Sequence, residues 1–304
     1  MSLDHQGGPR FLTPIEAELR SLLAGHVERL AGTIGERNVW RYRGLVEAAA
    51  YIESVLQVLG HQVESQSYEV SGREVRNLAV ELPGAERPGE IVLVGAHYDS
   101  VLRSPGANDN ATGVAAVLEL ARLFAGRRLP RTLRLVAFVN EEPPFFRTPQ
   151  MGSVRYARRC SERGERIVAM LCLETIGCYS MERGSQSYPF PLGWFFPSRG
   201  DFVGFVANLT SRALLRRSLG AFRRRSTFRC EGVTAPGWIP GIGWSDHWAF
   251  WQFGYKAVMV TDTALFRYAH YHQPEDTPDK VDFEGTAQVV AGLAQVVEDL
   301  ATEP

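Results

Sequence analysis

Five side chains of the types that bind divalent metal ions are spread along the chain, each beside a strongly apolar or motif-rich segment. They are two imidazoles and three carboxylates: His97, Asp109, Glu142, Glu174 and His272. One catalytic zinc ion needs about three protein ligands and an open position. Five ligands suit two ions if one carboxylate bridges them, and Asp109, short and central in the chain order, is the candidate for the bridge.

Two further carboxylates stand next to these candidate ligands. Glu141 precedes Glu142 and is free to act as a general base, because a carboxylate beside a metal site can take a proton from water and return it to a leaving amine. Asp99 lies two residues after His97 in an extended segment, so both side chains point the same way. We therefore expect the Asp99 carboxylate to accept the second ring N–H of His97 and to fix its tautomer.

The segments before these residues predict the elements that position them. Apolar runs at 91–97, 133–139 and 168–173 are typical of strands buried on both faces, and they end at His97, at Glu141–Glu142 and at Glu174. A fourth strand is expected at 256–260, ahead of His272. Ligands of parallel sheets bind beyond the carboxyl ends of the strands, so these side chains are expected to meet in one crevice.

The rest of the chain alternates strands with helices. Helical periodicity is found twice within residues 1–60 and again at 109–125, 152–160, 205–219 and 283–300, and further strands are expected at 66–70 and 75–82. This order predicts an α/β fold with a mostly parallel central sheet covered by helices on both faces, in a single domain spanning 1–304. Residues 178–204, rich in Gly, Pro, Ser and aromatic residues, are expected to form a loop excursion over the active site.

Six sequence segments resemble the motif series of the zinc-dependent aminopeptidase family with paired metals, which includes bacterial leucyl aminopeptidases, glutamate carboxypeptidase and glutaminyl cyclase. The segments are HYDSV, GANDNATG, AFVNEEPPFF, LCLETIG, SDHWAF and YHQPEDTPDKVD. The resemblance implies a mixed sheet of about eight strands and two Zn²⁺ ions per chain. It places His97, Asp109 and Glu174 on one ion and Asp109, Glu142 and His272 on the other.

The same resemblance implies that Glu141 is the base and that the Tyr271 hydroxyl polarises the scissile carbonyl. The expected activity is therefore metal-dependent removal of N-terminal residues from peptides. Two departures stand out: many members have Asp where this chain has Glu174, and the stretch after the paired glutamates, 143–152, is longer than usual. Glutaminyl cyclase-like chemistry with one zinc ion, and a metal-free binding module, remain alternatives.

Composition excludes other classes of protein. With 33 basic and 34 acidic residues the chain lacks the basic excess of a nucleic-acid-binding protein. No apolar run is long enough for a membrane span, and no signal peptide is seen, so we expect a cytoplasmic protein, or a secreted one if a leader was removed. The sequence does not indicate an oligomeric state. The aromatic-rich segments near the motifs favour Leu, Phe or Met at the substrate N-terminus over Asp or Glu, unless Arg147 or Arg199 points at the metals.

Overall fold

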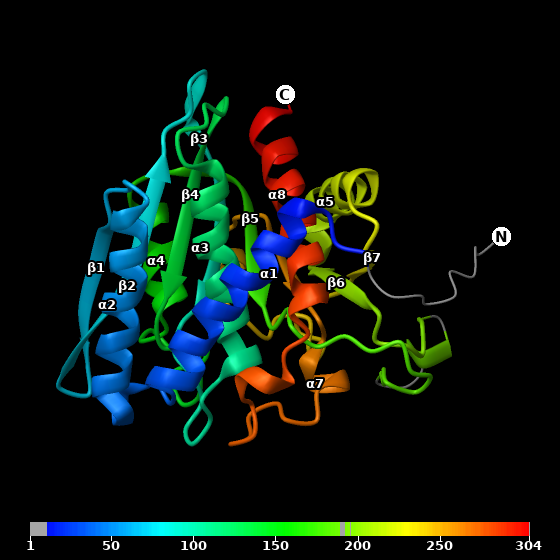
Figure 1. Ribbon diagram of the computed structural model, residues 1–304. Helices are drawn as coiled ribbons and strands as arrows, with labels where there is room; N and C mark the ends of the chain where they lie inside the picture. The colour runs from blue at the N-terminus through cyan, green and yellow to red at the C-terminus, as the bar shows by residue number, and fades with distance from the viewer. Residues whose placement is uncertain (1–10, 189–191, 195, 304) are drawn as a thin grey trace.

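The computed structural model describes residues 11–188, 192–194 and 196–303, and one eight-stranded sheet forms its centre (Figure 1). The strand order is β1-β2-β4-β3-β5-β8-β6-β7. The strands are β1 (Glu64–Val70), β2 (Arg73–Leu82), β3 (Arg87–His97), β4 (Arg131–Phe138), β5 (Arg166–Glu174), β6 (Phe202–Ala207), β7 (Arg229–Thr234) and β8 (Ala257–Thr261).

The sheet is mixed, and its central strands are parallel. β3 pairs in parallel with β4 on one side and with β5 on the other, and β5 pairs in parallel with β8. The pairs β1–β2, β2–β4 and β6–β8 are antiparallel, whereas β6–β7 is parallel. The α/β class, the single domain and the mixed, mostly parallel sheet expected from the sequence are confirmed.

Both faces of the sheet are covered by helices. One face carries α1 (Pro14–Val27), α2 (Tyr42–Val58), α3 (Thr112–Phe124), α5 (Arg212–Arg225) and α8 (Phe283–Thr302). The other face carries α4 (Gly152–Glu162) and α6 (His247–Gln252), and the short α7 (Ala264–Arg267) follows β8. Strand β3 shows how the sequence produces this sandwich: Val92 and Val94 join the core under the first set of helices, and Leu93 joins the core under the second.

Most of the expected elements occur near their expected positions, but one is wrong. Residues 205–219 were expected to be one helix, whereas β6 ends at Ala207 and α5 begins only at Arg212. Strand β6 is buried on both faces, and such a continuous apolar run lacks the alternation that marks a half-buried strand. Because β6 begins at Phe202, the expected excursion at 178–204 ends at Asp201. Its residues 189–191 and 195, like residues 1–10 of the N-terminal region, lie outside the described residues.

No helix within the described ranges is long and apolar enough to cross a membrane.

Candidate metal centre

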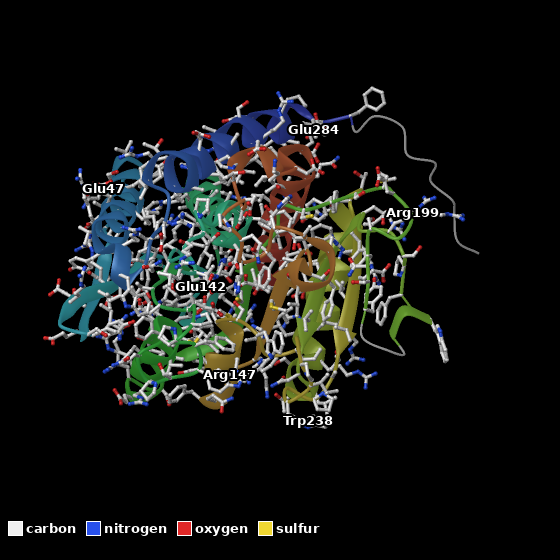
Figure 2. The ribbon with its side chains drawn as sticks, turned by 90° about the horizontal axis from the view of Figure 1, so that it is seen from below. Glu47, Glu142, Arg147, Arg199, Trp238 and Glu284 are labelled. Carbon is white, nitrogen blue, oxygen red and sulfur yellow. The ribbon has the colours of Figure 1, made fainter. Side chains whose placement is uncertain are left out.

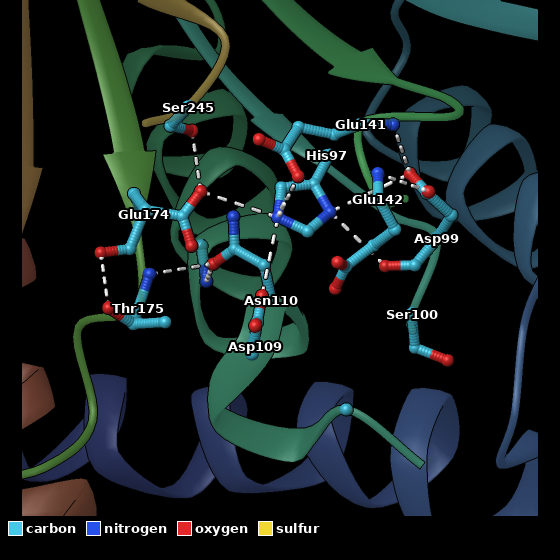
Figure 3. Close-up of polar contacts among 12 residues, drawn as sticks. His97, Asp99, Ser100, Asp109, Asn110, Glu141, Glu142, Glu174, Thr175 and Ser245 are labelled. Carbon is cyan, nitrogen blue, oxygen red and sulfur yellow. Dashed lines mark hydrogen bonds and ion pairs between the residues drawn. The ribbon is translucent and has the colours of Figure 1, made fainter. Parts of the chain in front are cut away.

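The carboxyl ends of the parallel strands β4, β3 and β5 place the candidate side chains close together at one end of these strands. His97 is the last residue of β3, Glu174 is the last residue of β5, and Glu141 and Glu142 follow the end of β4. Asp109 comes from a kinked turn, Ala107–Ala111, directly before α3. The fifth residue, His272, lies in the loop after α7, and the structure brings all five expected metal ligands together (Figure 3 shows four of them).

The first group of donors surrounds the ring nitrogen Nε2 of His97. Asp109 Oδ1 lies 3.4 Å from it and Glu174 Oε2 lies 3.3 Å from it. This nitrogen is buried and has no hydrogen-bond partner among the described residues. Ser245 donates a 2.5 Å hydrogen bond to the same Glu174 oxygen and orients that carboxylate (Figure 3).

The second group of donors surrounds Nε2 of His272. Asp109 Oδ2 lies 3.2 Å from this nitrogen, and Glu142 Oε2 lies 3.3 Å from it. Asp109 therefore contributes one oxygen to each group. Glu141 belongs to neither trio, although its Oε2 lies 3.9 Å from His97 Nε2 and it forms a looser cluster with His97 and Glu142.

These spacings match the distances between neighbouring ligand atoms of a zinc site. Bonds of about 2.0–2.1 Å in tetrahedral geometry separate two ligand atoms by about 3.3 Å. The four distances from His97 and His272 to their carboxylate neighbours run from 3.2 to 3.4 Å. Imidazole and carboxylate are also the ligands that catalytic zinc sites use. The donor set therefore fits zinc.

Electrostatics supports the same conclusion. Burial raises the pKa of Glu141 well above its ordinary value, and burial together with the charge of Asp109 raises the pKa of Glu142 to about 7. Burial alone would lower the pKa of both histidines, but the surrounding carboxylates raise the pKa of His272 to about 10 and that of His97 well above its ordinary range. So many buried acidic groups need a compensating cation.

Asp99 differs from its expected role. The ring N–H at Nδ1 of His97 lies 3.2 Å from the backbone carbonyl oxygen of Asp99, and the carboxylate lies farther away, at 3.6 Å. The two carboxylate oxygens instead accept hydrogen bonds from the backbone N–H groups of Glu141 and Glu142, each at 3.1 Å. The sequence motif places Asp99 beside His97, but it does not reveal that the tip of β4 comes within reach.

Other buried side chains hold the backbone next to a candidate ligand in the same way. Asn110 donates to the carbonyl of Leu173 at 2.8 Å and accepts from the N–H of Thr175 at 3.1 Å, which fixes both neighbours of Glu174. Asp276 accepts from the N–H of Asp109 at 3.1 Å. Sequence reasoning gave Asn110 no role in the site and did not decide between an orienting role and a turn cap for Asp276, although both lie inside the motif segments.

The side chain of Arg37 holds the loop between β3 and Asp109 in place through hydrogen bonds to its backbone. Its side chain is fully buried, and within the described part of the chain its guanidinium donates to backbone carbonyl oxygens only. The acceptors are Leu30, Gly35, Tyr98, Pro105 and Gly106. Burial lowers the pKa of Arg37 to about 10, and the nearby carboxylates of the centre oppose that shift. No sequence signal identified this residue, because its partners are carbonyl groups that every residue carries.

Tyr271 lies at the border between the metal centre and a cavity. Its ring stacks on His272 with 3.9 Å between ring centroids and 17° between planes. Burial raises its pKa, so its hydroxyl stays protonated and can donate a hydrogen bond.

The adjoining cavity has a volume of about 400 Å³, and Glu174 and Tyr271 lie in its wall. Most of its lining is aliphatic or aromatic, from the sheet, from residues 235–244 and from the segments around Tyr188 and Phe266. Arg147 and Arg199 are not among the lining residues. The Arg147 guanidinium donates to the carbonyl of Gly243, and Figure 2 places Arg199 at the edge of the molecule, far from Glu142.

Comparison with known proteins agrees with this geometry. The profile of Peptidase family M28 matches residues 77–297. The uncharacterized protein YfbL of Escherichia coli is 37% identical over 295 residues, covering 94% of this chain and 88% of its own length. A probable zinc metalloprotease of Pyrenophora teres f. teres is 28% identical over 276 residues, covering 80% of this chain but 53% of its own length.

Among solved structures, the zinc aminopeptidase BSAP from Bacillus subtilis has the same fold, with a TM-score of 0.75 and 16% identity over 93% of this chain and 95% of its own. The family match covers most of the chain and includes every candidate ligand. The chain therefore belongs to peptidase family M28 and is a zinc metallopeptidase.

Proposed function

We propose that the protein is an aminopeptidase with two zinc ions, which removes N-terminal residues from peptides. The observation that carries this proposal is the position of Asp109, whose two oxygens face two separate trios of donors. His97, Asp109 and Glu174 would hold one ion, and Asp109, Glu142 and His272 would hold the other. When bound, the ions supply Lewis acidity that polarises a peptide carbonyl and makes water a better nucleophile at neutral pH.

Glu141 is the proposed general base. It is buried beside the donors and is not needed by either trio, and burial holds its pKa well above the ordinary value for glutamate. A carboxylate of raised pKa can both accept a proton from the attacking water and return it to the leaving amine. Asp99 acts through Glu141 and Glu142, because it fixes the backbone of both. The Tyr271 hydroxyl, at the border of the cavity, donates to the scissile carbonyl oxygen.

The surroundings of the centre favour an exopeptidase. The carboxylates attract the free α-ammonium group that only a chain terminus carries. The adjoining cavity of about 400 Å³ accommodates one side chain, and its apolar lining rewards burial by about 25 cal/mol per Å². Apolar N-terminal residues are therefore proposed over acidic ones, which would meet Glu174 with no cation among the described lining residues.

Metal analysis combined with a substrate panel tests this function. Protein purified without chelators is expected to contain two equivalents of zinc and to hydrolyse aminoacyl-anilides. The matched N-acetylated anilides serve as the control and should not be cleaved, because they lack the ammonium group. One equivalent of zinc with cyclisation of N-terminal glutaminyl peptides would favour the glutaminyl cyclase alternative. Failure of the zinc-loaded protein to cleave any free N-terminus would overturn the proposal.

A further inference from the structure

A row of four residues crosses the floor of the cavity from the metal centre to the edge of the sheet. Glu174 on β5 pairs with Thr261 on β8, Thr261 pairs with Gly204 on β6, and Gly204 pairs with Glu231 on β7. Residues directly opposite in a ladder point to the same face of a sheet. All four line the cavity, on the face that carries α4 and α6.

The middle of this row carries no charge, and its far end is a carboxylate. Gly204 has no side chain, and the Thr263 methyl carbon lies 3.3 Å from the position that a Cβ would take there. Among the described residues, the remaining lining has no arginine, lysine, histidine or aspartate, and its only carboxylates are Glu174 and Glu231. Glu231 is half-buried, and no cationic side chain among the described residues forms an ion pair with it. The mostly apolar cavity therefore has these two carboxylates at the opposite ends of the row.

We propose that this cavity selects peptides whose N-terminal residue is lysine or arginine, with Glu231 as the residue that recognises the cationic head group. The inference rests on the proposed aminopeptidase function and names its substrate class. The long aliphatic stem of either side chain suits the apolar walls, and only its end carries charge. Lysine and arginine differ in this way from leucine and phenylalanine, which would fill the cavity and leave Glu231 unpaired.

The length of the row fits such a side chain. Neighbouring strands lie about 4.8 Å apart, so three strand spacings put the Cα atom of Glu231 about 14 Å from the Cα atom of Glu174. An extended lysine spans about 6.3 Å from Cα to Nζ, and its α-nitrogen adds about 1.5 Å. With a hydrogen bond of about 2.8 Å at each end, an N-terminal lysine bridges about 13 Å. A shorter side chain stops over Gly204, while arginine reaches slightly farther than lysine.

Norleucine is the decisive comparison, because it matches the lysine stem and lacks the ammonium group. The zinc-loaded wild-type protein is expected to cleave lysyl-p-nitroanilide with a kcat/KM about two- to fivefold higher than norleucyl-p-nitroanilide, the range for a partly exposed ion pair. In Glu231→Gln this ratio should fall to about one. In Glu231→Lys it should fall below one, and cleavage of glutamyl-p-nitroanilide should rise.

Glu86→Gln is the matched control, since Glu86 is exposed in the turn before β3 and does not line the cavity. It should keep the wild-type ratio. Melting curves of all variants show whether they are folded. A wild-type ratio of one or less, or a ratio unchanged in Glu231→Gln, would overturn the role of Glu231 even if norleucyl-p-nitroanilide is cleaved. If no anilide with a free N-terminus is cleaved by the zinc-loaded protein, the aminopeptidase function itself fails.

Discussion

Replacing Asp99 by asparagine tests whether this buried carboxylate holds the two glutamates that follow β4. Its two oxygens accept from the N–H groups of Glu141 and Glu142 at 3.1 Å each. Asparagine keeps one acceptor oxygen but turns an NH₂ group toward the second N–H. One hydrogen bond is therefore lost with its buried donor left unpaired, and the other is no longer assisted by a charge. Hydrogen bonds to charged groups contribute about 1.5–3 kcal/mol each, and we expect the zinc-loaded variant to lose about this free energy of unfolding.

The same substitution, Asp99→Asn, should also weaken zinc binding. Outer partners of ligands typically alter metal affinity by about 10- to 100-fold, and we expect zinc affinity to fall within this range because Glu142 is displaced. In the zinc-free protein the loss of stability should be smaller, since removing one negative charge also relieves repulsion among the buried carboxylates.

Urea denaturation with excess zinc and with chelator, together with zinc competition against a chromophoric chelator, measures these effects. Asp279→Asn is the control: its side chain is 66% exposed, so the substitution should leave the unfolding midpoint and the zinc affinity close to those of the wild type. If zinc-loaded Asp99→Asn matches the wild type in both its unfolding midpoint and its zinc affinity, Asp99 does not position the glutamates and the reasoning fails.

Three other substitutions address the base, the bridge and a buried histidine. Glu141→Gln keeps the shape of the side chain but removes the proton acceptor, so kcat should fall by about 10²–10⁴ with zinc content near that of the wild type; retention of most activity would assign the base elsewhere. Asp109→Ala should lower occupancy of both metal positions in metal analysis, and loss of one ion with the other bound as before would contradict the bridge. Burial lowers the pKa of His247 from 6.5 to about 4, so its contribution to stability is present above pH 6.5 and is lost as the pH falls toward 4, by about 3 kcal/mol at 1.36 kcal/mol per pKa unit. His247→Gln should flatten the fall in melting temperature between pH 6.5 and 4, and an unchanged fall would show that other groups cause it.

The residues of the metal centre could be predicted from the sequence because they follow directly after the apolar runs that form strands. Apolar runs followed at once by histidine or glutamate predict strands that end in ligands, and parallel strands end at a common edge. His97 and Glu174 illustrate this, since each is the last residue of its strand. The roles of these side chains toward zinc stay predictions, as does the cytoplasmic location.

Features that depend on pairing between distant segments could not be predicted from the sequence. β7 carries polar residues and a glycine at the edge of the sheet, so it lacks the signal of a buried strand. The alignment of Glu231 with Glu174 follows from the register of three ladders, which no local pattern specifies. The hydrogen bonds of Asp99 to Glu141 and Glu142 depend on β3 and β4 lying side by side, which their separation in sequence does not reveal.

The buried guanidinium of Arg37 sets a limit on how far the enzyme can be shortened. The family profile begins at residue 77, forty residues after Arg37, yet the carbonyls of Tyr98, Pro105 and Gly106 rely on that side chain. A fragment trimmed to the profile would leave these acceptors without their donor and would uncover the surface of α8 against which α1 packs. The catalytic unit is therefore larger than its recognisable motif region, and a shortened form of the protein should retain the residues from α1 onward.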